Sequence, residues 1–307
     1  MSKSLPRICV VGSSNIDLTF RTTRLPRPGE TLTGQAFQLG FGGKGANQAL
    51  MAARLGARVT MISRVGRDLF GEQTLHNYQQ HGIDTAHVRR DDERPTGTAA
   101  IVVEDSGQNS ILIVAGANAA LMPEDVRAAQ TLLREASVVL CQLEVAVQTT
   151  REAFVMARAA GVRTILNPAP AVPLPDELLR LTDLCIPNET EAELLTGQRV
   201  TTPEEAKAAA EILQQRGAGA VLVTLGERGV VVVDEGWEHI PAPPVRAVDA
   251  SGAGDAFIGS LAVFLLEGLS LRQAAQCANR VAALSVTRPG TQASFPTRAE
   301  IDDLPFG

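Results

Sequence analysis

Asp255 is the residue whose surroundings most clearly suggest chemistry. It follows two closely spaced glycines, Gly252 and Gly254, and residues from about 256 to 267 predict a helix directly after it. Free backbone N–H groups at a helix start can hold an anion. A carboxylate beside a bound phosphate would repel it unless the carboxylate takes a proton from the attacking group, so the pattern favours a general base. The alternative is that Asp255 only caps the helix.

A second glycine-rich segment carries weaker signals. Gly40, Gly42 and Gly45 formally satisfy the G-x-G-x-x-G pattern of dinucleotide-binding proteins. That pattern should close the first strand, which here ends near Gly12. Lys44 is followed by Gly45 rather than Ser or Thr, so the segment is not a Walker A motif either.

Short apolar runs recur along the chain and predict the strands that would position these residues. They cover 8–12, 59–62, 138–141, 164–166, 184–186 and 221–224. Between them, stretches rich in Ala, Leu, Glu and Arg predict helices over 46–55, 70–80, 149–160 and 203–216. Strands that alternate with helices predict an α/β fold. Its mostly parallel sheet would be covered by helices on both faces, as a three-layer α/β/α sandwich.

Two stretches break this alternation. Residues 18–39 alternate polar and apolar side chains around two prolines, and residues 96–114 read as two strands about a turn at Asp105-Ser106-Gly107. We expect the two stretches to pair as a small β-sheet lid over the larger body. The sequence has no internal repeat or linker, so residues 1–307 are predicted to form a single domain with two lid insertions.

Composition excludes several classes of protein. The 307 residues are 45% hydrophobic and 20% charged, with a net charge of -6, which argues against a nucleic-acid or anionic-membrane binder. No apolar run approaches the roughly 18 residues of a membrane span. The four cysteines form no C-x-x-C pair, and three lie in apolar runs. Reduced thiols and the lack of an export signal favour a cytoplasmic location.

Several motifs, taken together in their order, resemble those of the PfkB family of sugar and nucleoside kinases. The segment 252–255 resembles the family's signature, and Gly42-Gly43-Lys44-Gly45-Ala46-Asn47-Gln48-Ala49 resembles its N-terminal sugar-site signature. Further matches lie at 115–118, 167–170, 187–191 and 224–226. The combination is similar to the ribose-phosphorylating branch, and it extends from Ile8 to about Phe295.

The resemblance implies transfer of the ATP γ-phosphoryl group to a sugar hydroxyl. Such a transfer needs positioning, charge neutralisation and a base for the nucleophile. By resemblance, Asp255 is the base that deprotonates the 5-hydroxyl of D-ribose. The amides of Gly252, Ala253, Gly254 and Asp255 would form the anion hole for the transferred group.

A ribose offers many hydrogen-bonding groups and little apolar surface, so its site needs carboxylates and amides. The resemblance places six residues there, besides Asp255: Asn15, Asp17, Gly43, Lys44, Asn47 and Glu144. Asn15 and Asp17 follow the first strand, where ligands of α/β proteins bind, but they are also common turn residues. Glu144 has the alternative of a solvated loop acid, and Lys44 that of a surface charge.

The nucleotide side is less explicit. Asn188 and Glu191 resemble the family's Asn-x-x-Glu motif, which helps to organise Mg²⁺ and phosphate, with water between Glu191 and the ion. The same pair also fits a capping box. The resemblance implies that the remaining ATP-binding positions are Thr224, Gly226, Gly229, Gly254 and Asn279. Asn279 has the alternative of an exposed residue in a helix.

The resemblance also implies a K⁺ site beside the anion hole, at Asp249, Ser251, Ser285, Arg288, Gly290 and Ser294. K⁺ prefers oxygen ligands, so four of these positions (Ser251, Ser285, Arg288 and Gly290) would act through backbone carbonyls. The side chain of Arg288 has no acceptor atom. Position 250 is Ala where many members of the family have Thr, a departure that bears on cation affinity.

Alternative functions remain at this point. A kinase for 2-deoxyribose or another sugar comes second, and a non-catalytic sugar-binding protein is opposed by the intact segment 252–255. An amide at Asn15 favours ribose, because it can bond a hydroxyl that deoxyribose lacks. One Trp and one Tyr offer little for the base pocket of a nucleoside kinase. Members of the family pair through their lids, which implies a homodimer.

Overall fold

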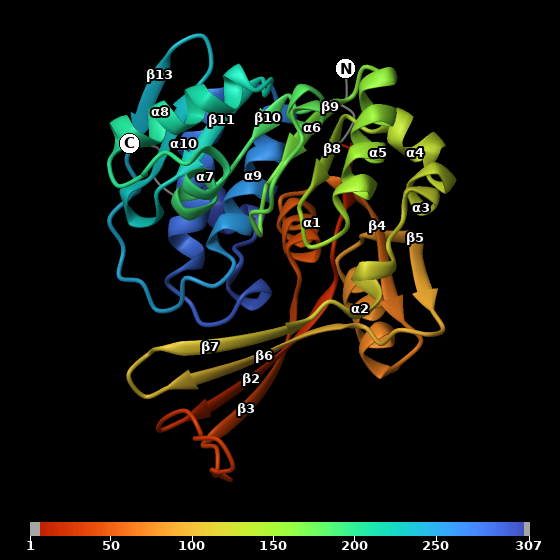
Figure 1. Cartoon of the computed structure of the whole chain (residues 1–307), viewed down its shortest axis with the longest axis vertical. Helices are drawn as coiled ribbons and strands as arrows, with labels where there is room; N and C mark the ends of the chain where they lie inside the picture. The colour runs from red at the N-terminus through yellow and green to blue at the C-terminus, as the bar shows by residue number, and fades with distance from the viewer. Residues whose placement is uncertain (1–6, 304–307) are drawn as a thin grey trace.

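The central sheet determines which ends of the strands can carry a site. The computed structural model describes residues 7–303. Their main sheet has nine strands in the order β13-β12-β11-β10-β9-β8-β1-β4-β5 (Figure 1). The bounds are β1 (Arg7–Val11), β4 (Arg58–Gly66), β5 (Asp84–Asp91), β8 (Val138–Cys141), β9 (Arg163–Leu166), β10 (Leu184–Cys185), β11 (Ala220–Thr224), β12 (Val230–Val233) and β13 (Trp237–Ile240).

All neighbouring strands from β5 to β11 run parallel, and only β12 and β13 are added antiparallel. The predicted α/β class and mostly parallel sheet are therefore confirmed. From β1 the chain leads to β4 and β5 on one side, and later to β8 on the other. The carboxyl ends of the strands beside such a reversal are where open α/β sheets bind ligands.

Alternating side chains of the buried strands supply two separate cores. Ile8 and Val10 of β1 belong to one core, and Cys9 and Val11 belong to the other. The first core is covered by α1 (Lys44–Arg54), α2 (Leu69–Gln80), α9 (Ala253–Leu266), α10 (Leu271–Ser285) and α11 (Arg298–Asp302). The second lies mainly under α3 (Pro123–Ala128), α4 (Gln130–Glu135), α5 (Val147–Ala159), α6 (Asp176–Arg180), α7 (Glu189–Thr196) and α8 (Pro203–Gln215).

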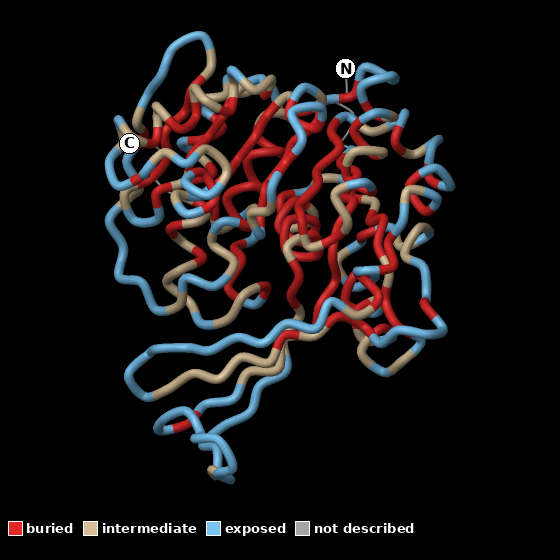
Figure 2. Tube along the Cα trace, viewed as in Figure 1, coloured by how far each residue is buried: buried red, intermediate tan, exposed pale blue. Residues whose placement is uncertain are grey.

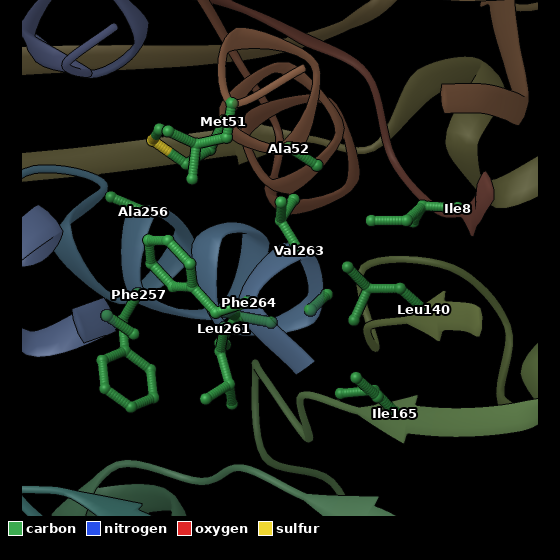
Figure 3. Close-up of a cluster of buried hydrophobic side chains, with 14 of the residues drawn as sticks. Ile8, Met51, Ala52, Leu140, Ile165, Ala256, Phe257, Leu261, Val263 and Phe264 are labelled. Atoms are coloured by element: carbon green, nitrogen blue, oxygen red, sulfur yellow. The ribbon is translucent and has the colours of Figure 1, made fainter. Parts of the chain in front are cut away.

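Helices α1 and α9 pack against each other on the first face of the sheet. Figure 3 shows Met51 of α1, Val263 and Phe264 of α9 and Leu140 of the sheet in one cluster of buried apolar side chains. At Gly259 of α9, a Cβ atom would come within 2.6 Å of the Gln48 carbonyl oxygen in α1. This close approach fixes the starts of the two helices relative to each other, and both starts carry predicted site residues.

The second sheet projects from the body (Figure 1). Its order is β3-β2-β6-β7, from β2 (Asn15–Thr22), β3 (Ala36–Gly42), β6 (Gly97–Glu104) and β7 (Asn109–Val114). The β2–β3 ladder continues to the pair Asn15 and Gly42, so these strands reach three residues beyond the predicted segment 18–39 at each end. Much of this sheet is exposed (Figure 2).

Three short 3₁₀ helices complete the described chain: η1 (Gly116–Ala120), η2 (Gly226–Arg228) and η3 (Gln292–Ser294). Cys9, Cys141 and Cys185 are buried free thiols in β1, β8 and β10, as their apolar neighbours predict. Across residues 7–303, no helix is both long and apolar enough to cross a membrane.

Candidate active site

Asp255 lies in the first turn of α9. The helix begins at Ala253, three residues before the predicted start, so Gly254 lies in the first turn rather than before the helix, whereas the expected place of Asp255 at the helix start is found. The reason is Gly252, whose φ of 76° turns the chain into the helix. The Asp255 carboxylate accepts from Asn47 Nδ2 at 2.8 Å and Gln48 Nε2 at 2.9 Å instead of capping the helix.

The two glycines beside Asp255 have different physical reasons. A Cβ at Gly252 would lie 2.5 Å from Thr291 Cγ2, so this position needs glycine for both space and backbone conformation. Gly254 is exposed, and a Cβ there would meet no heavy atom of residues 7–303 within 4 Å. The N–H groups of Gly254 and Asp255 lie in the first turn, where no intrahelical acceptor exists. The first turn therefore offers open space and free donors beside a buried carboxylate.

Several charges surround this carboxylate. Burial raises the pKa of Asp255 above its ordinary value, while Lys44 and the two amides oppose the rise and Glu144 adds to it. Lys44 is the first residue of α1. Burial alone would lower the pKa of Lys44, but Asp255, Glu144 and Glu191 together raise it. The alternative of a surface charge for Lys44 is therefore wrong, because its cation lies among three carboxylates.

Asn15 and Asp17 lie in β2, not in a turn, so their alternative as turn residues is also wrong. Asn15 is buried, and its Oδ1 accepts from Asn118 Nδ2 at 2.7 Å, which leaves the Asn15 amide hydrogens for another acceptor. Burial, followed by the charges of Glu144 and Asp255, raises the pKa of Asp17 to about 6. Asp17 thus belongs to the same group of charges as Asp255.

Glycines let the β2–β3 ladder approach α1 at this point. A Cβ at Gly42 would lie 2.3 Å from Asp17 Oδ1. Gly43, the N-cap of α1, has a φ of 88°, and a Cβ there would lie 2.8 Å from the Asn15 nitrogen. These contacts hold Asn15 and Asp17 next to Lys44.

Glu144 follows β8 and is half-buried. Its Oε2 accepts from Ser13 Oγ at 2.5 Å and from the Lys44 backbone N–H at 2.9 Å. Glu144 is therefore not a solvated loop acid. Through this one oxygen it joins the segment after β1 to the start of α1.

The capping box predicted for Asn188 and Glu191 is present at the start of α7. Asn188 Oδ1 accepts from the Glu191 N–H at 2.8 Å, and Glu191 Oε2 accepts from the Asn188 N–H at 2.9 Å. Glu191 is buried, which raises its pKa, while Asn188 and Lys44 oppose the rise and Asp255 adds to it. Asn188 also forms an isolated β-bridge with Thr224. The box thus fixes a carboxylate that faces both Lys44 and Asp255.

Two of the other predicted nucleotide positions, Gly229 and Asn279, meet near the end of β13. A Cβ at Gly229 would lie 2.1 Å from the Ile240 carbonyl oxygen, and Asn279 Nδ2 donates to the same oxygen at 3.1 Å. Asn279 is buried, so the alternative of an exposed helical residue is wrong. Gly226 is exposed at the start of η2, with a φ of 57°.

The predicted cation positions come from two loops that the structure ties together. Asp249 accepts from the Ser251 N–H at 2.9 Å and from the Gly290 N–H at 2.8 Å. Burial alone would raise the pKa of Asp249, but these hydrogen bonds hold it below its ordinary value. The Arg288 guanidinium is paired with Glu300 at 2.6 Å. The hydroxyls of Ser285 and Ser294 donate to nearby carbonyls.

Sequence reasoning did not assign a role to Gln48, Gln142, Asn167 or Gln292, yet all four are buried beside Asp255 or its partners. One signal was available for Gln48. With Asn47 it forms a polar pair near the start of a helix whose next four residues, 49–52, are apolar and buried. A buried polar pair on the start of such a helix indicates a functional contact.

Comparisons with known proteins agree with this geometry. A family model described as pfkB family carbohydrate kinase matches residues 5–298. The chain is 44% identical to the ribokinase of Mus musculus over 300 residues, 96% of this chain and 93% of that protein. It is 41% identical to the deoxyribokinase of Salmonella typhi, over 96% of this chain and 97% of that protein.

A solved structure is also similar over nearly the whole chain. The ribokinase of Arabidopsis thaliana, complexed with ribose and ATP, has a TM-score of 0.91 and 33% identity, over 97% of this chain and 98% of that chain. The family match and these relatives cover both sheets and every predicted site residue. The chain therefore belongs to the PfkB family of carbohydrate kinases.

Proposed function

We propose that this kinase transfers the γ-phosphoryl group of ATP to the 5-hydroxyl of D-ribose and forms ribose 5-phosphate. One observation carries the proposal: Asp255 is buried, held by two amides, and adjoins the open first turn at Gly254. The ribokinase relatives and the neighbour complexed with ribose and ATP support the choice of substrates. The deoxyribokinase relative makes 2-deoxyribose the second candidate.

In the proposed reaction Asp255 accepts the proton of the 5-hydroxyl. The oxygen then forms a bond to the γ-phosphorus while the bond to the bridging oxygen of ADP breaks. The N–H groups of the segment 252–255 stabilise the charge on the transferred group. Lys44 offsets the negative charge that Asp255, Glu144 and Glu191 gather at the site. Asn15, Asp17, Gly43, Asn47 and Glu144 would hold the sugar, and Asn188, Thr224, Gly226, Gly229 and Asn279 the nucleotide.

Two cations fit the residues present. Glu191 is a buried carboxylate fixed by its capping box, and Mg²⁺ bound through water near it would neutralise phosphate charge. In the described part of the chain, no cluster of three or more His, Cys, Asp or Glu side chains forms a metal site. K⁺ suits the oxygen atoms of Asp249, Ser251, Ser285, Arg288, Gly290 and Ser294, because the Asp249 carboxylate ties their two loops together.

A coupled ATPase assay over ribose, 2-deoxyribose, fructose and adenosine tests the proposed function directly. We expect the largest kcat/KM with ribose. A larger value for deoxyribose would transfer the proposal to the second candidate. No sugar-dependent ADP release from the folded protein would reject both.

Asn15→Ala tests the choice between the two pentoses. Asn118 occupies the Asn15 oxygen, so its amide hydrogens would bond the 2-hydroxyl, which deoxyribose lacks. We expect kcat/KM for ribose to fall about three- to tenfold, the value of one hydrogen bond, with little change for deoxyribose. The ratio of the two kcat/KM values is the measurement. Equal losses on both sugars would remove Asn15 from this role.

Replacing K⁺ by a large organic cation tests the monovalent site. A bulky cation cannot fit between the loops that Asp249 joins, so we expect kcat to fall at constant ionic strength and to recover when K⁺ is restored. Activity that is the same in both salts would remove K⁺ from the proposal.

The projecting sheet supports a homodimer. Phe37 of β3 is 58% exposed and Leu112 of β7 is 70% exposed, on the two edge strands of the sheet. Exposed apolar edge strands are usually covered. We expect a dimer in sedimentation velocity at micromolar concentration, and Leu112→Lys should shift it toward monomer. A wild-type monomer under these conditions would contradict the proposal.

We also propose that residues 1–307 act as one domain, with 18–39 and 96–114 as lid insertions, in the cytoplasm. The small sheet formed by β2, β3, β6 and β7 supports the lid. The four free cysteines support a reducing compartment.

A further inference from the structure

Two chains of side-chain amides end on the Asp255 carboxylate, one on each oxygen. In the first, Asn77 Nδ2 donates to Gln292 Oε1 at 3.0 Å, and Gln292 Nε2 donates to Asn47 Oδ1 at 3.0 Å. Asn47 Nδ2 then donates to Asp255 Oδ2 at 2.8 Å. We call this set the long relay. Its members come from α2, η3 and α1, and each is 5–6% exposed.

The second chain, the short relay, reaches the other oxygen. Gln142 Nε2, after β8, donates to Gln48 Oε1 at 2.6 Å. Gln48 Nε2 donates to Asp255 Oδ1 at 2.9 Å and to Asn167 Oδ1 at 3.1 Å. Gln48 and Gln142 have no exposed surface. Every amide of both relays therefore turns its nitrogen toward the carboxylate.

This common direction follows from the chemistry of Asp255. An ionised carboxylate only accepts hydrogen bonds, so the atoms of Asn47 and Gln48 that touch it must be nitrogens. Each amide then presents its oxygen to the next residue, which must donate in turn. The charge of Asp255 thus determines which atom of each amide donates, as far as Asn77 in the long relay and Gln142 in the short relay.

The same logic accounts for a buried atom that lacks a partner. The Oε1 atom of Gln142 is buried, yet it has no hydrogen-bond partner among the described residues. It lies at the outer end of the short relay, against Gly12, where a Cβ would come within 2.2 Å of it. Turning this amide would not give the oxygen a donor, because it would set two acceptor oxygens, on Gln142 and Gln48, against each other. A buried unpaired acceptor costs stability, so a benefit at Asp255 is needed to explain its retention.

We propose that Gln48 and Gln292 are positioning residues for Asp255, which hold its carboxylate ionised and in one orientation through the two relays. The inference rests on the proposed role of Asp255 as the base. Side-chain amides do not titrate, so this support is the same at every pH. The charged groups that face Asp255 are Lys44 on α1, Glu144 after β8, Asp17 on β2 and Glu191 on α7.

Replacement by methionine removes the donors and keeps the length of the side chain. For Gln48→Met we expect kcat to fall about tenfold at pH 8 and the acidic limb of the kcat profile to move up by about one pH unit, with KM for ATP within twofold. Gln292→Met acts through Asn47, so we expect the same directions with smaller changes. The control is Gln73→Met on α2, whose buried Oε1 also lacks a partner but lies outside both relays. We expect it to leave the profile unchanged.

A second measurement does not depend on turnover. The difference in Tm between a protein with Asp255 and its Asp255→Asn variant changes with pH as Asp255 titrates, so the midpoint of that change reports the pKa of Asp255. This midpoint should move up in the Gln48→Met background. If this midpoint moves but no sugar is phosphorylated, the relays stand and the proposed function fails. An unmoved midpoint and acidic limb in folded Gln48→Met would overturn the inference. If Gln48→Met does not fold, the same two measurements on Gln292→Met decide the question. Because Gln292 adjoins the proposed cation loop, the K⁺ concentration that gives half-maximal activity is measured for this variant as well, to separate an effect on K⁺ binding from an effect on Asp255.

Discussion

Asp255→Asn should lower kcat by roughly 10²–10⁴-fold, the contribution typical of a positioned general base. The substituted amide keeps the size of the side chain but cannot take the proton of the hydroxyl. Lys44, Glu144 and Glu191 remain in place, so we expect ribose and ATP to bind with affinities close to those of the wild type. Turnover by a coupled assay and binding by calorimetry separate the two effects. Near-normal turnover would reject Asp255 as the base.

The same substitution should change stability with a definite dependence on pH. The pKa of Asp255 is raised in the folded protein, mainly by burial. The folded protein therefore holds this proton more tightly than the unfolded chain, and its stability falls as pH rises between the unfolded and folded pKa values. At pH values above both pKa values, this loss of folding stability has reached its full size. We expect the Tm of Asp255→Asn, relative to that of the wild type, to be higher at pH 8 than at pH 4.

A scan of Tm against pH for both proteins measures this difference. Asp255→Glu is the matched control, because it keeps a buried charge at the site. A Tm difference between Asp255→Asn and the wild type that is the same at pH 4 and pH 8 would mean that burial does not raise the pKa of Asp255.

Six strands of the main sheet and the helices α1, α2, α5 and α8 could be predicted because their signals are local. The runs that contain Val10, Leu140 and Val223 are apolar over four or more residues, and each is a buried strand. The start of α9 could not be predicted in the same way. Gly252 adopts its left-handed conformation against Thr291 and Phe295, about 40 residues later in the chain, which only the fold brings into contact.

In the candidate site, too, some residues could be predicted from local sequence and others only from the fold. Asp255, Lys44 and Asn47 stand in short motifs, so sequence alone could indicate them. The relays could not be found this way, because Asn47 is separated from Gln292 by 245 positions and Gln48 from Asp255 by 207. Glutamine and asparagine are common surface residues. Only burial and mutual orientation distinguish these amides from solvated ones.

Gly254→Val should nearly abolish turnover while the protein folds normally. A Cβ at this position meets no heavy atom of the described residues within 4 Å, so the added side chain enters open space at the helix turn that carries Asp255. In the proposed mechanism that space holds the transferred phosphoryl group. Excluding the group from its donors should lower kcat by roughly 10²–10³-fold, as the loss of an oxyanion-hole donor does.

Gly254→Ala separates catalysis from folding more sharply. Gly254 lies in the first turn of α9, in a conformation that alanine adopts, and Gly→Ala at such a site stabilises a protein by about 0.4–1 kcal/mol. We therefore expect a higher Tm together with a lower kcat. Gly236→Ala is the control, since its Cβ would make only an ordinary contact of 3.7 Å with Arg272, outside the site. Full activity in both Gly254 variants would contradict the anion hole, because both added side chains would enter the space that the transferred phosphoryl group is proposed to occupy.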